Sequence, residues 1–153
     1  MAIYNFIGQP HSGKTTLANH LRKVLEFANP TRKVFMVDGD ILRQIIKNKD
    51  YSETGRRQNI TTAYNIAKYL DSTEDFDVII AVVSPFLDIR ERFKLEADVT
   101  EIFVHTTNIR GRENFHVENY EYPKNNFIDI DTTDVDELTS VNELLDKLNL
   151  KKE

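Results

Sequence analysis

The sequence predicts an α/β protein of three layers, in which helices cover both faces of a five-stranded parallel sheet. Short apolar runs alternate along the chain with segments whose apolar residues recur at helical spacing, and this alternation is typical of parallel sheets. The run from Val78 to Val83 is apolar at every position, as expected of a strand that is buried on both faces. We therefore place this strand at the centre of the sheet.

The first half of the chain holds two expected strands and three expected helices. Residues 3–7 form a short apolar run, and the helix from Thr15 to Phe27 follows because Leu17, Leu21, Val24 and Leu25 share one face. Asn29-Pro30 ends that helix. The remaining elements of this half are a strand at 34–37, a helix at 41–46 and a helix capped at Ser52 that runs to about Leu70.

The second half continues the alternation. A charged helix from Asp88 to Leu95 precedes two strands, at 101–105 and 127–131. The last helix carries the apolar residues Val135, Leu138, Val141, Leu144, Leu145 and Leu148. Between the last two strands, the 21 residues 106–126 show no periodicity, and loops of this length are usually functional lids or disordered. Two arginines and three aromatic residues favour a lid.

The composition indicates one ordinary globular domain, residues 1–153. Hydrophobic residues make up 40% of the chain and charged residues 29%. The net charge of −5 gives no reason to expect nucleic-acid or membrane partners, and no apolar run approaches the length of a membrane span. The absence of cysteine excludes disulfides, thiolate metal sites and cysteine nucleophiles. Because no signal peptide is recognisable either, we expect a cytoplasmic protein.

Residues 8–16 match the phosphate-binding loop pattern at every fixed position, between an expected strand and an expected helix. Gly8 and Gly13 let the backbone N–H groups turn toward an anion, and the helix adds its positive end. Lys14 would reach the β- and γ-phosphates, while the Thr15 hydroxyl would bind Mg²⁺. These features predict the P-loop nucleoside triphosphate hydrolase/kinase fold rather than a simple turn. The expected nucleotide-binding residues are Gly8, His11, Ser12, Gly13, Lys14, Thr15 and Thr16.

Two aspartates follow the strand at 34–37, at the sheet edge where ligands of open α/β sheets bind. The Asp38 carboxylate suits binding of Mg²⁺ or acceptance of a proton from an attacking hydroxyl, although Asp-Gly is also common turn and helix-cap chemistry. Asp40 suits a substrate hydroxyl and a cap for the helix at Ile41 equally well. Ser84-Pro85-Phe86 leaves a neighbouring strand at the same edge.

Arginines and aromatic residues surround the expected acceptor side. Guanidinium groups match the oxygens of phosphate or sulfate, so their number favours an anionic acceptor. For any single arginine a solvated helix face is the commoner role, most clearly for Arg57 and Arg92. The aromatic candidates for stacking on a base are also commonly core residues. The arginines are Arg43, Arg56, Arg57, Arg90 and Arg92, and the aromatic residues are Tyr51, Phe86 and Phe115.

These segments together resemble the adenylylsulfate (APS) kinase family of P-loop kinases, from the N-terminus to about Arg92. Members of that family transfer the γ-phosphate of ATP to the 3′-hydroxyl of adenosine 5′-phosphosulfate, giving PAPS, and they are commonly homodimers. The resemblance rests on four blocks, Gly8-x4-Gly13-Lys14-Thr15-Thr16-Leu17-Ala18, Asp38-Gly39-Asp40-x-Leu42-Arg43, Tyr51-Ser52-Glu53-x-x-Arg56-x-x-Asn59-Ile60 and Ser84-Pro85-Phe86 with Arg90.

The resemblance implies a role for each matching residue. Lys14 and Asp38 would be catalytic, and Thr15 and Asp38 would bind Mg²⁺. Tyr51 stands where the family has a phenylalanine that stacks on the substrate adenine. The full set implied to bind APS is Asp40, Arg43, Tyr51, Arg56, Asn59, Ser84, Pro85 and Phe115.

The expected lid departs from the family pattern. The family's C-x-x-R-D-x-K-G-L-Y-like segment is missing, so the lid is shorter. Asn114-Phe115 resembles the segment with the family's second adenine-stacking phenylalanine, but Glu113 stands where the family usually has lysine. Arg110 and Arg112 are the candidates to substitute for the missing lid cation.

Three functions fit these residues to different degrees. A compact APS kinase is favoured, and its shorter lid would raise KM and permit some ATP hydrolysis. A related P-loop kinase for another small nucleoside, nucleotide or hydroxyl compound would explain the remodelled lid but not the acceptor-side residues. A nucleotide-binding module without transferase activity fits least well, because Asp38, Arg43, Arg56 and Asn59 are all present.

Overall fold

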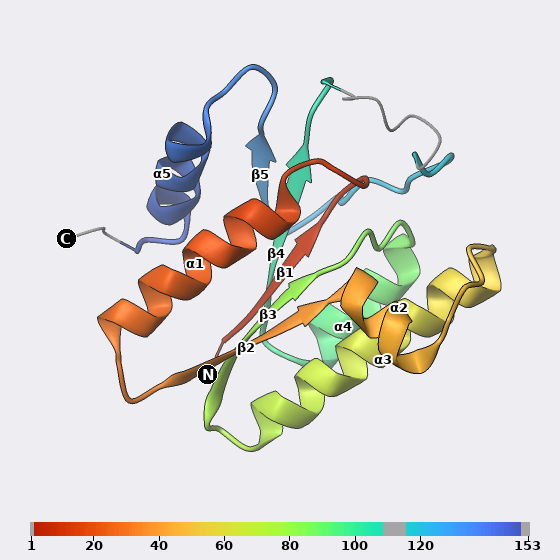
Figure 1. The fold of residues 1–153 in the computed structure, drawn as a ribbon, viewed down its shortest axis with the longest axis horizontal. Helices are drawn as coiled ribbons and strands as arrows, with labels where there is room; N and C mark the ends of the chain where they lie inside the picture. The colour runs from red at the N-terminus through yellow and green to blue at the C-terminus, as the bar shows by residue number, and fades with distance from the viewer. Residues whose placement is uncertain (1, 109–115, 151–153) are drawn as a thin grey trace.

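The computed structural model of the protein describes residues 2–108 and 116–150. It confirms the predicted α/β architecture, with five parallel strands in the order β2-β3-β1-β4-β5 (Figure 1). In chain order the elements are β1 (Ile3–Ile7), α1 (Lys14–Ala28), β2 (Lys33–Asp38), α2 (Gly39–Ile46), α3 (Glu53–Ser72), β3 (Phe76–Ala81), α4 (Leu87–Glu96), β4 (Val99–His105), β5 (Phe127–Asp131) and α5 (Glu137–Lys147).

The middle strand of the sheet is β1, and the placement of β3 at the centre was wrong by one strand. β1 pairs with β3 and β4, so that Ile3 lies opposite Val78 on one side and Val99 on the other. β3 is still an interior strand, between β2 and β1, which explains why its sequence is apolar throughout. The chain leaves β1 for β2 at one edge of the sheet and leaves β3 for β4 on the other side, so the crevice lies at the carboxyl ends of these two neighbouring strands.

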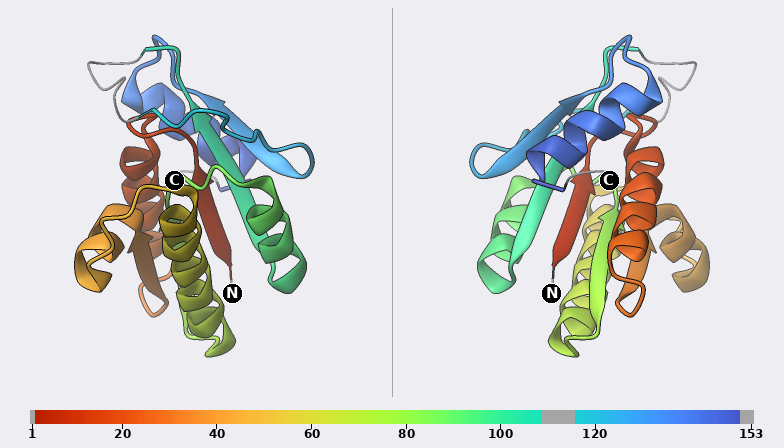
Figure 2. Two further views of the ribbon diagram at one scale, coloured as in Figure 1. Left: turned by 90° about the vertical axis from the view of Figure 1, so that its right-hand side faces the viewer. Right: turned by 90° about the vertical axis from the view of Figure 1, so that its left-hand side faces the viewer.

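Each face of the sheet has its own apolar core. Helices α1 and α5 cover one face, where Leu17 and Leu144 pack with Phe6 of β1. Helices α2, α3 and α4 cover the other, where Ile60 and Phe93 pack with the opposite side of the strands. Figures 1 and 2 show these two helical layers. Within the described residues, no helix has both the length and the apolarity to cross a membrane.

The buried apolar face of the last helix includes fewer residues than the sequence predicted. Val141, Leu144 and Leu145 are buried, as predicted. Leu138, however, is 58% exposed and Val135 is 38% exposed, because α5 begins only at Glu137 and turns Leu138 away from the sheet. The predicted cap of α3 is confirmed, since the Ser52 hydroxyl accepts a hydrogen bond from the Gly55 N–H.

Arg90 is a buried structural residue and does not lie on the acceptor side as expected. Its side chain is 1% exposed and donates hydrogen bonds to the carbonyl oxygens of Ser84 and Glu121. Its Nε lies 3.6 Å from Oε2 of Glu101 on β4. Burial raises the pKa of Glu101, although Lys94 and Arg90 act in the opposite direction. Arg90 therefore joins the end of β3, strand β4 and the chain at residue 121.

The expected lid is described at both of its ends but not in its middle. Residues 109–115, which include Arg110, Arg112 and Phe115, lie outside the described residues. We use the name return segment for residues 116–126. It contains no helix or strand and leads into β5.

We predict that Arg90→Met lowers the free energy of unfolding by about 3–5 kcal/mol, because it leaves the buried Glu101 carboxyl without its guanidinium partner. Arg92→Met, on the exposed side of the same helix, is the matched control and should change stability by about 0.5 kcal/mol or less. Urea unfolding at pH 7 measures both. Equal losses in the two variants would contradict the structural role of Arg90.

Candidate active site

The phosphate loop turns tightly between the carboxyl end of β1 and the first turn of α1. Gly8 and Gly13 have φ angles of +144° and +104°, which side-chain-bearing residues rarely adopt. A Cβ atom at Gly8 would lie 2.1 Å from the carbonyl oxygen of Val104, so only glycine fits there. No side chain caps α1 at its N-terminus, which leaves the first N–H groups of the helix to bind an anion.

Lys14 is folded into this loop. Its side chain is 8% exposed, and its Nζ donates a hydrogen bond to the backbone carbonyl of Gln9 at 2.7 Å. Burial lowers the pKa of Lys14 to about 8, against the opposing effect of Asp40 and Asp38. A phosphate in the loop would give the ammonium group a charged partner and so favour its protonated form.

Asp38 caps helix α2, which was one of its two expected roles. Its Oδ1 accepts hydrogen bonds from the N–H groups of Asp40 and Ile41, at 2.9 and 3.1 Å. Asp40, the other candidate for this cap, instead lies exposed in the first turn of the helix. Both aspartates line a cleft beside Lys14.

This cleft has a volume of about 720 Å³ and brings most of the predicted site residues together. Its phosphate end is formed by the loop and by the start of α1, and its far end by α2, α3 and the chain after β3. Of the other predicted residues, Gly8 is buried at the start of the loop, Ser12 lines a second cavity, and Phe115 is outside the described residues. The predicted residues that line the cleft are His11, Gly13, Lys14, Thr15, Thr16, Asp38, Asp40, Arg43, Tyr51, Arg56, Asn59, Ser84 and Pro85.

Tyr51 and two arginines form a cationic wall at the far end of the cleft. The guanidinium carbons of Arg43 and Arg56 lie 4.1 and 5.6 Å from the centre of the Tyr51 ring, within the range of a cation–π contact. Arg43 donates hydrogen bonds to the carbonyl oxygens of Asn48 and Asp50, and Arg56 donates to that of Tyr51. Burial, and to a lesser degree Arg43, lower the pKa of Arg56. These contacts hold the two guanidinium groups beside the Tyr51 ring. The wall therefore offers an aromatic surface and positive charge together, which suits an aromatic anion.

A buried polar chain supports the cleft from below, and the sequence did not predict it. The Tyr64 hydroxyl is hydrogen-bonded to Asn5 at 2.9 Å and to Ser84 Oγ at 2.6 Å. Burial raises the pKa of Tyr64 to about 12. Ser84 has a φ of +46°, a strained conformation for a residue with a side chain. The one sequence signal was Asn5, a polar residue inside the apolar run of β1.

Asn59 contributes an amide to the same floor. It is 5% exposed and its Nδ2 donates a hydrogen bond to the carbonyl of Gly39 at 3.3 Å. Its buried Oδ1 has no hydrogen-bond partner among the described residues. A buried acceptor without a donor costs free energy, which a hydroxyl or amine of a ligand would recover.

Two residues expected near the acceptor are engaged elsewhere. Arg57 forms an ion pair with Asp88 at 3.0 Å, and its guanidinium carbon lies 4.2 Å from the centre of the Phe86 ring. Side-chain hydrogen bonding to Asp88 raises the pKa of Arg57. Arg57 and Phe86 therefore cover one another and do not line the cleft. This agrees with the helix-surface role favoured for Arg57 and with the packing role that is common for an aromatic residue such as Phe86.

A second cavity of about 320 Å³ meets the cleft at the phosphate loop, where His11, Gly13 and Thr16 line both. Ser12 lines this second cavity, and its buried Oγ lacks a partner among the described residues. The cavity is otherwise formed by Leu17, Thr106, Asn108, Thr132, Val135, Asp136, Glu137 and Ser140.

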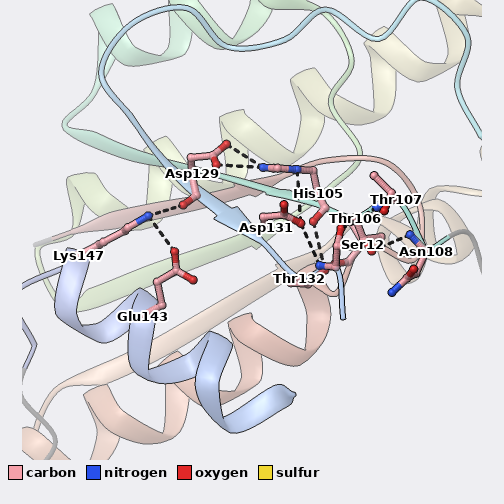
Figure 3. A network of polar contacts seen from close by, with 11 residues as sticks. Ser12, His105, Thr106, Thr107, Asn108, Asp129, Asp131, Thr132, Glu143 and Lys147 are labelled. Atoms are coloured by element: carbon pink, nitrogen blue, oxygen red, sulfur yellow. Dashed lines mark hydrogen bonds and ion pairs between the residues drawn. The ribbon is translucent and has the colours of Figure 1, made fainter. Parts of the chain in front are cut away.

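Polar contacts join this second cavity to the ends of β4 and β5 (Figure 3). Thr132 donates through Oγ1 to the carbonyl of Ser12 at 2.9 Å, and its N–H donates to the carbonyl of His105 at 2.8 Å. His105 in turn contacts Asp129 at 2.9 Å. The phosphate loop is thus tied to a strand more than a hundred residues away in sequence.

A sheet of this order, a phosphate loop after its middle strand and a cationic wall across the cleft define the class of P-loop kinases. The chain belongs to the adenylylsulphate kinase family, whose model matches residues 1–131. The resemblance found in the sequence is thereby confirmed.

Similar proteins agree with this assignment. The chain is 37% identical to the adenylyl-sulfate kinase of Burkholderia ambifaria over 87 residues, which are 56% of this chain and 46% of that protein. It therefore spans about half the length of this curated relative. In fold it is similar to the APS kinase of Mycobacterium tuberculosis in complex with AMPPNP and APS, with a TM-score of 0.80, 21% identity and 97% of each chain covered. The hexameric APS kinase of Thiobacillus denitrificans has a TM-score of 0.75 and 25% identity, over 96% of this chain and 28% of that one.

We predict that ADP binding without Mg²⁺ weakens about tenfold per pH unit above pH 8, because the free site loses the Lys14 proton that a bound phosphate favours. Below pH 8 the ammonium group is already protonated, so the affinity should level off there. Calorimetry in EDTA between pH 7 and 10 measures this dependence. Lys14→Met should bind weakly and without the break near pH 8, whereas the same break in that variant would assign the proton to another group.

Proposed function

We propose that this protein transfers the γ-phosphate of ATP to the 3′-hydroxyl of adenosine 5′-phosphosulfate and so forms PAPS. The observation that carries the proposal is a single cleft with Lys14 at one end and the Tyr51 wall at the other. Phosphoryl transfer requires positioning and neutralisation of charge more than covalent chemistry from the protein. The cleft provides a cationic group at each end for these two tasks.

The donor would lie across the phosphate loop. Its phosphates fit the cradle of N–H groups between Gly8 and Thr16, with Lys14 beside the β- and γ-phosphates. Its base fits the second cavity, which meets the cleft at this loop and presents Ser12 and Asn108 as polar partners. The two cavities would thus separate the base of the donor from the acceptor.

The residues beside the phosphates suit Mg²⁺. The Thr15 hydroxyl and the Asp38 carboxylate are the oxygen ligands that this ion prefers, and both line the cleft. Among the described residues, no group of three or more His, Cys, Asp or Glu could hold a metal by itself. The ion would therefore be shared between these two side chains and the phosphates, whose negative charge it reduces. Asp38 would also accept the proton of the attacking hydroxyl.

The acceptor would occupy the far end of the cleft. Tyr51 would lie against its adenine, while Arg43 and Arg56 would face its phosphate and sulfate groups. Asn59 and Asp40 would accept hydrogen bonds from hydroxyl or amino groups. Ser84 and Pro85 would complete the pocket floor, and Phe115 remains a prediction outside the described residues.

We extend the proposal to the setting of the enzyme. The proposed reaction would serve sulfate assimilation in the cytoplasm. The net charge of −5 gives no reason to expect nucleic acid or a membrane as a partner. Residues 1–153 would act as one kinase domain under a shortened lid, residues 106–126. Assembly into a homodimer or larger homo-oligomer is proposed by analogy with the hexameric relative.

We predict that Arg56→Ala weakens binding of APS, in the presence of Mg²⁺-ADP, by about 10- to 100-fold, the size expected for loss of charge-assisted hydrogen bonds. Arg57→Ala is the matched control, because the guanidinium of Arg57 is paired with Asp88 outside the cleft. The affinity of this variant for APS should stay within about twofold of the wild-type value. Calorimetry measures both. If the wild type binds ADP but no APS, the acceptor is a different compound, and labelled ATP with a panel of nucleosides, nucleotides and other hydroxyl compounds would identify it.

We predict that Asp38→Asn retains the fold but lowers kcat by about 100- to 10,000-fold, since an amide neither accepts the proton nor binds Mg²⁺ well. An asparagine oxygen can still cap α2, so the melting temperature should remain that of the wild type. Asp38→Ala should lose the same activity and also about 1 kcal/mol of stability, because it removes the cap. An active Asp38→Asn variant would reduce the role of Asp38 to capping.

A further inference from the structure

The side chain of Gln9 holds the return segment against the phosphate loop. Its Nε2 donates to the carbonyl of Val117 at 2.8 Å, and its Oε1 accepts from the N–H of Val117 at 2.8 Å. One side-chain amide thus satisfies both backbone groups of a residue 108 positions away. The backbone carbonyl of the same Gln9 accepts the hydrogen bond of Lys14. Gln9 therefore connects the return segment to the lysine of the loop.

The return segment is fixed at a second place, on the acceptor side. The buried Tyr120 donates its hydroxyl proton to the carbonyl of Val83, and the N–H of Glu121 donates to the carbonyl of Pro85 at 3.0 Å. The carbonyl of Glu121 accepts a hydrogen bond from Arg90. Residues 117–121 are consequently held between the phosphate loop and the floor of the acceptor pocket.

His116 directly precedes this fixed stretch. Among the described residues of the 106–126 segment, only His116 lines the cleft. Of the other histidines, His20 faces the carboxylate of Glu137 and His105 faces that of Asp129, whereas His116 forms no ion pair among the described residues. Its imidazole is therefore available to a ligand in the cleft.

The lysine and arginine side chains of the cleft are unevenly distributed, which leaves a role for another hydrogen-bond donor near the phosphates. Arg43 and Arg56 lie at the Tyr51 end and donate to backbone carbonyls there, so Lys14 is the one lysine or arginine of the described lining at the phosphate end. The transferred phosphoryl group carries charge on three oxygens, so there is room for one more donor beside Lys14, the N–H groups of the loop and the proposed Mg²⁺.

We propose that His116 is a further substrate-contacting residue, whose imidazole N–H binds a phosphate oxygen in the cleft, and that Gln9 is its positioning residue. This inference rests on the proposed kinase function. A donor beside the charge that develops during transfer stabilises the transition state more than the bound substrates, so its loss should appear in kcat rather than in KM.

A double-mutant cycle tests the assignment. Gln9→Met keeps the length of the side chain but removes both hydrogen bonds to Val117, and His116→Ala removes the imidazole. We expect His116→Ala to lower kcat about 100-fold, with KM for APS changed less than threefold. Gln9→Met should lower kcat about tenfold in the wild type but less than twofold in His116→Ala, because both changes act through one group. Gln58→Met, on the exposed surface of α3, and His20→Ala, at a half-buried position of α1, are the matched controls. Neither residue lines the cleft, so both variants should retain wild-type rates.

The outcomes separate the two levels of the proposal. Independent effects of the two changes, or a His116→Ala variant within twofold of the wild type, would overturn the inference. Should Gln9→Met prove poorly folded by its melting temperature, Gln9→Glu provides the second variant, since it keeps the acceptor for the Val117 N–H and loses only the donor. If the wild type makes no PAPS, the proposed function fails, and the same four proteins are compared in their calorimetric affinity for Mg²⁺-ATP. If the effects of Gln9→Met and His116→Ala on that affinity are coupled, His116 remains a phosphate contact. If the two effects are additive, the assignment of His116 is overturned.

Discussion

The close approach of Gly8 to the carbonyl of Val104 is the contact on which the site depends. It brings the carboxyl ends of the two neighbouring strands β1 and β4 together, and no side chain fits between them. The loop can then turn back over the sheet edge, where Thr132 from the end of β5 donates to the carbonyl of Ser12. The uncapped end of α1 and the buried Lys14 follow from this turn. A backbone constraint therefore places the charge-binding groups before any ligand contributes.

Buried polar groups fix the acceptor side of the cleft. Their hydrogen bonds are directional, whereas apolar packing alone would not fix the orientation of the backbone there. Arg90 and Glu101 lie within the protein, and the guanidinium donors connect two carbonyls that belong to different segments. Ion pairs of this kind seldom add stability over apolar packing, but they leave few alternative arrangements once both partners are buried. The strained Ser84 lies inside this framework, held by Tyr64 below and Arg90 beside it.

The sequence predicted the sheet and the phosphate loop well because both depend on local patterns. The strands at 3–7 and 127–131 have the bounds expected from their apolar runs. The order of the strands was harder to predict. The sequence of β1 contains the polar Asn5 and therefore looks less buried than that of β3, although both strands are interior. Arg90 was misplaced because an arginine on a charged helix is normally solvated, and its burial depends on Glu101 from another strand. Gln9 has no local signal at all, as its partner lies 108 residues away.

The return segment is attached at two places, and this attachment lowers the entropic cost of ordering a short lid when substrate binds. A lid that is ordered only by substrate uses binding free energy to fix its backbone, which weakens the affinity that its contacts provide. Here residues 117–121 have their hydrogen bonds made within the protein itself, by Gln9 at one end and by Pro85 and Arg90 at the other. That ordering belongs to folding rather than to binding. A group delivered by such a segment acts from a fixed position, which is the condition for electrostatic stabilisation of a transition state.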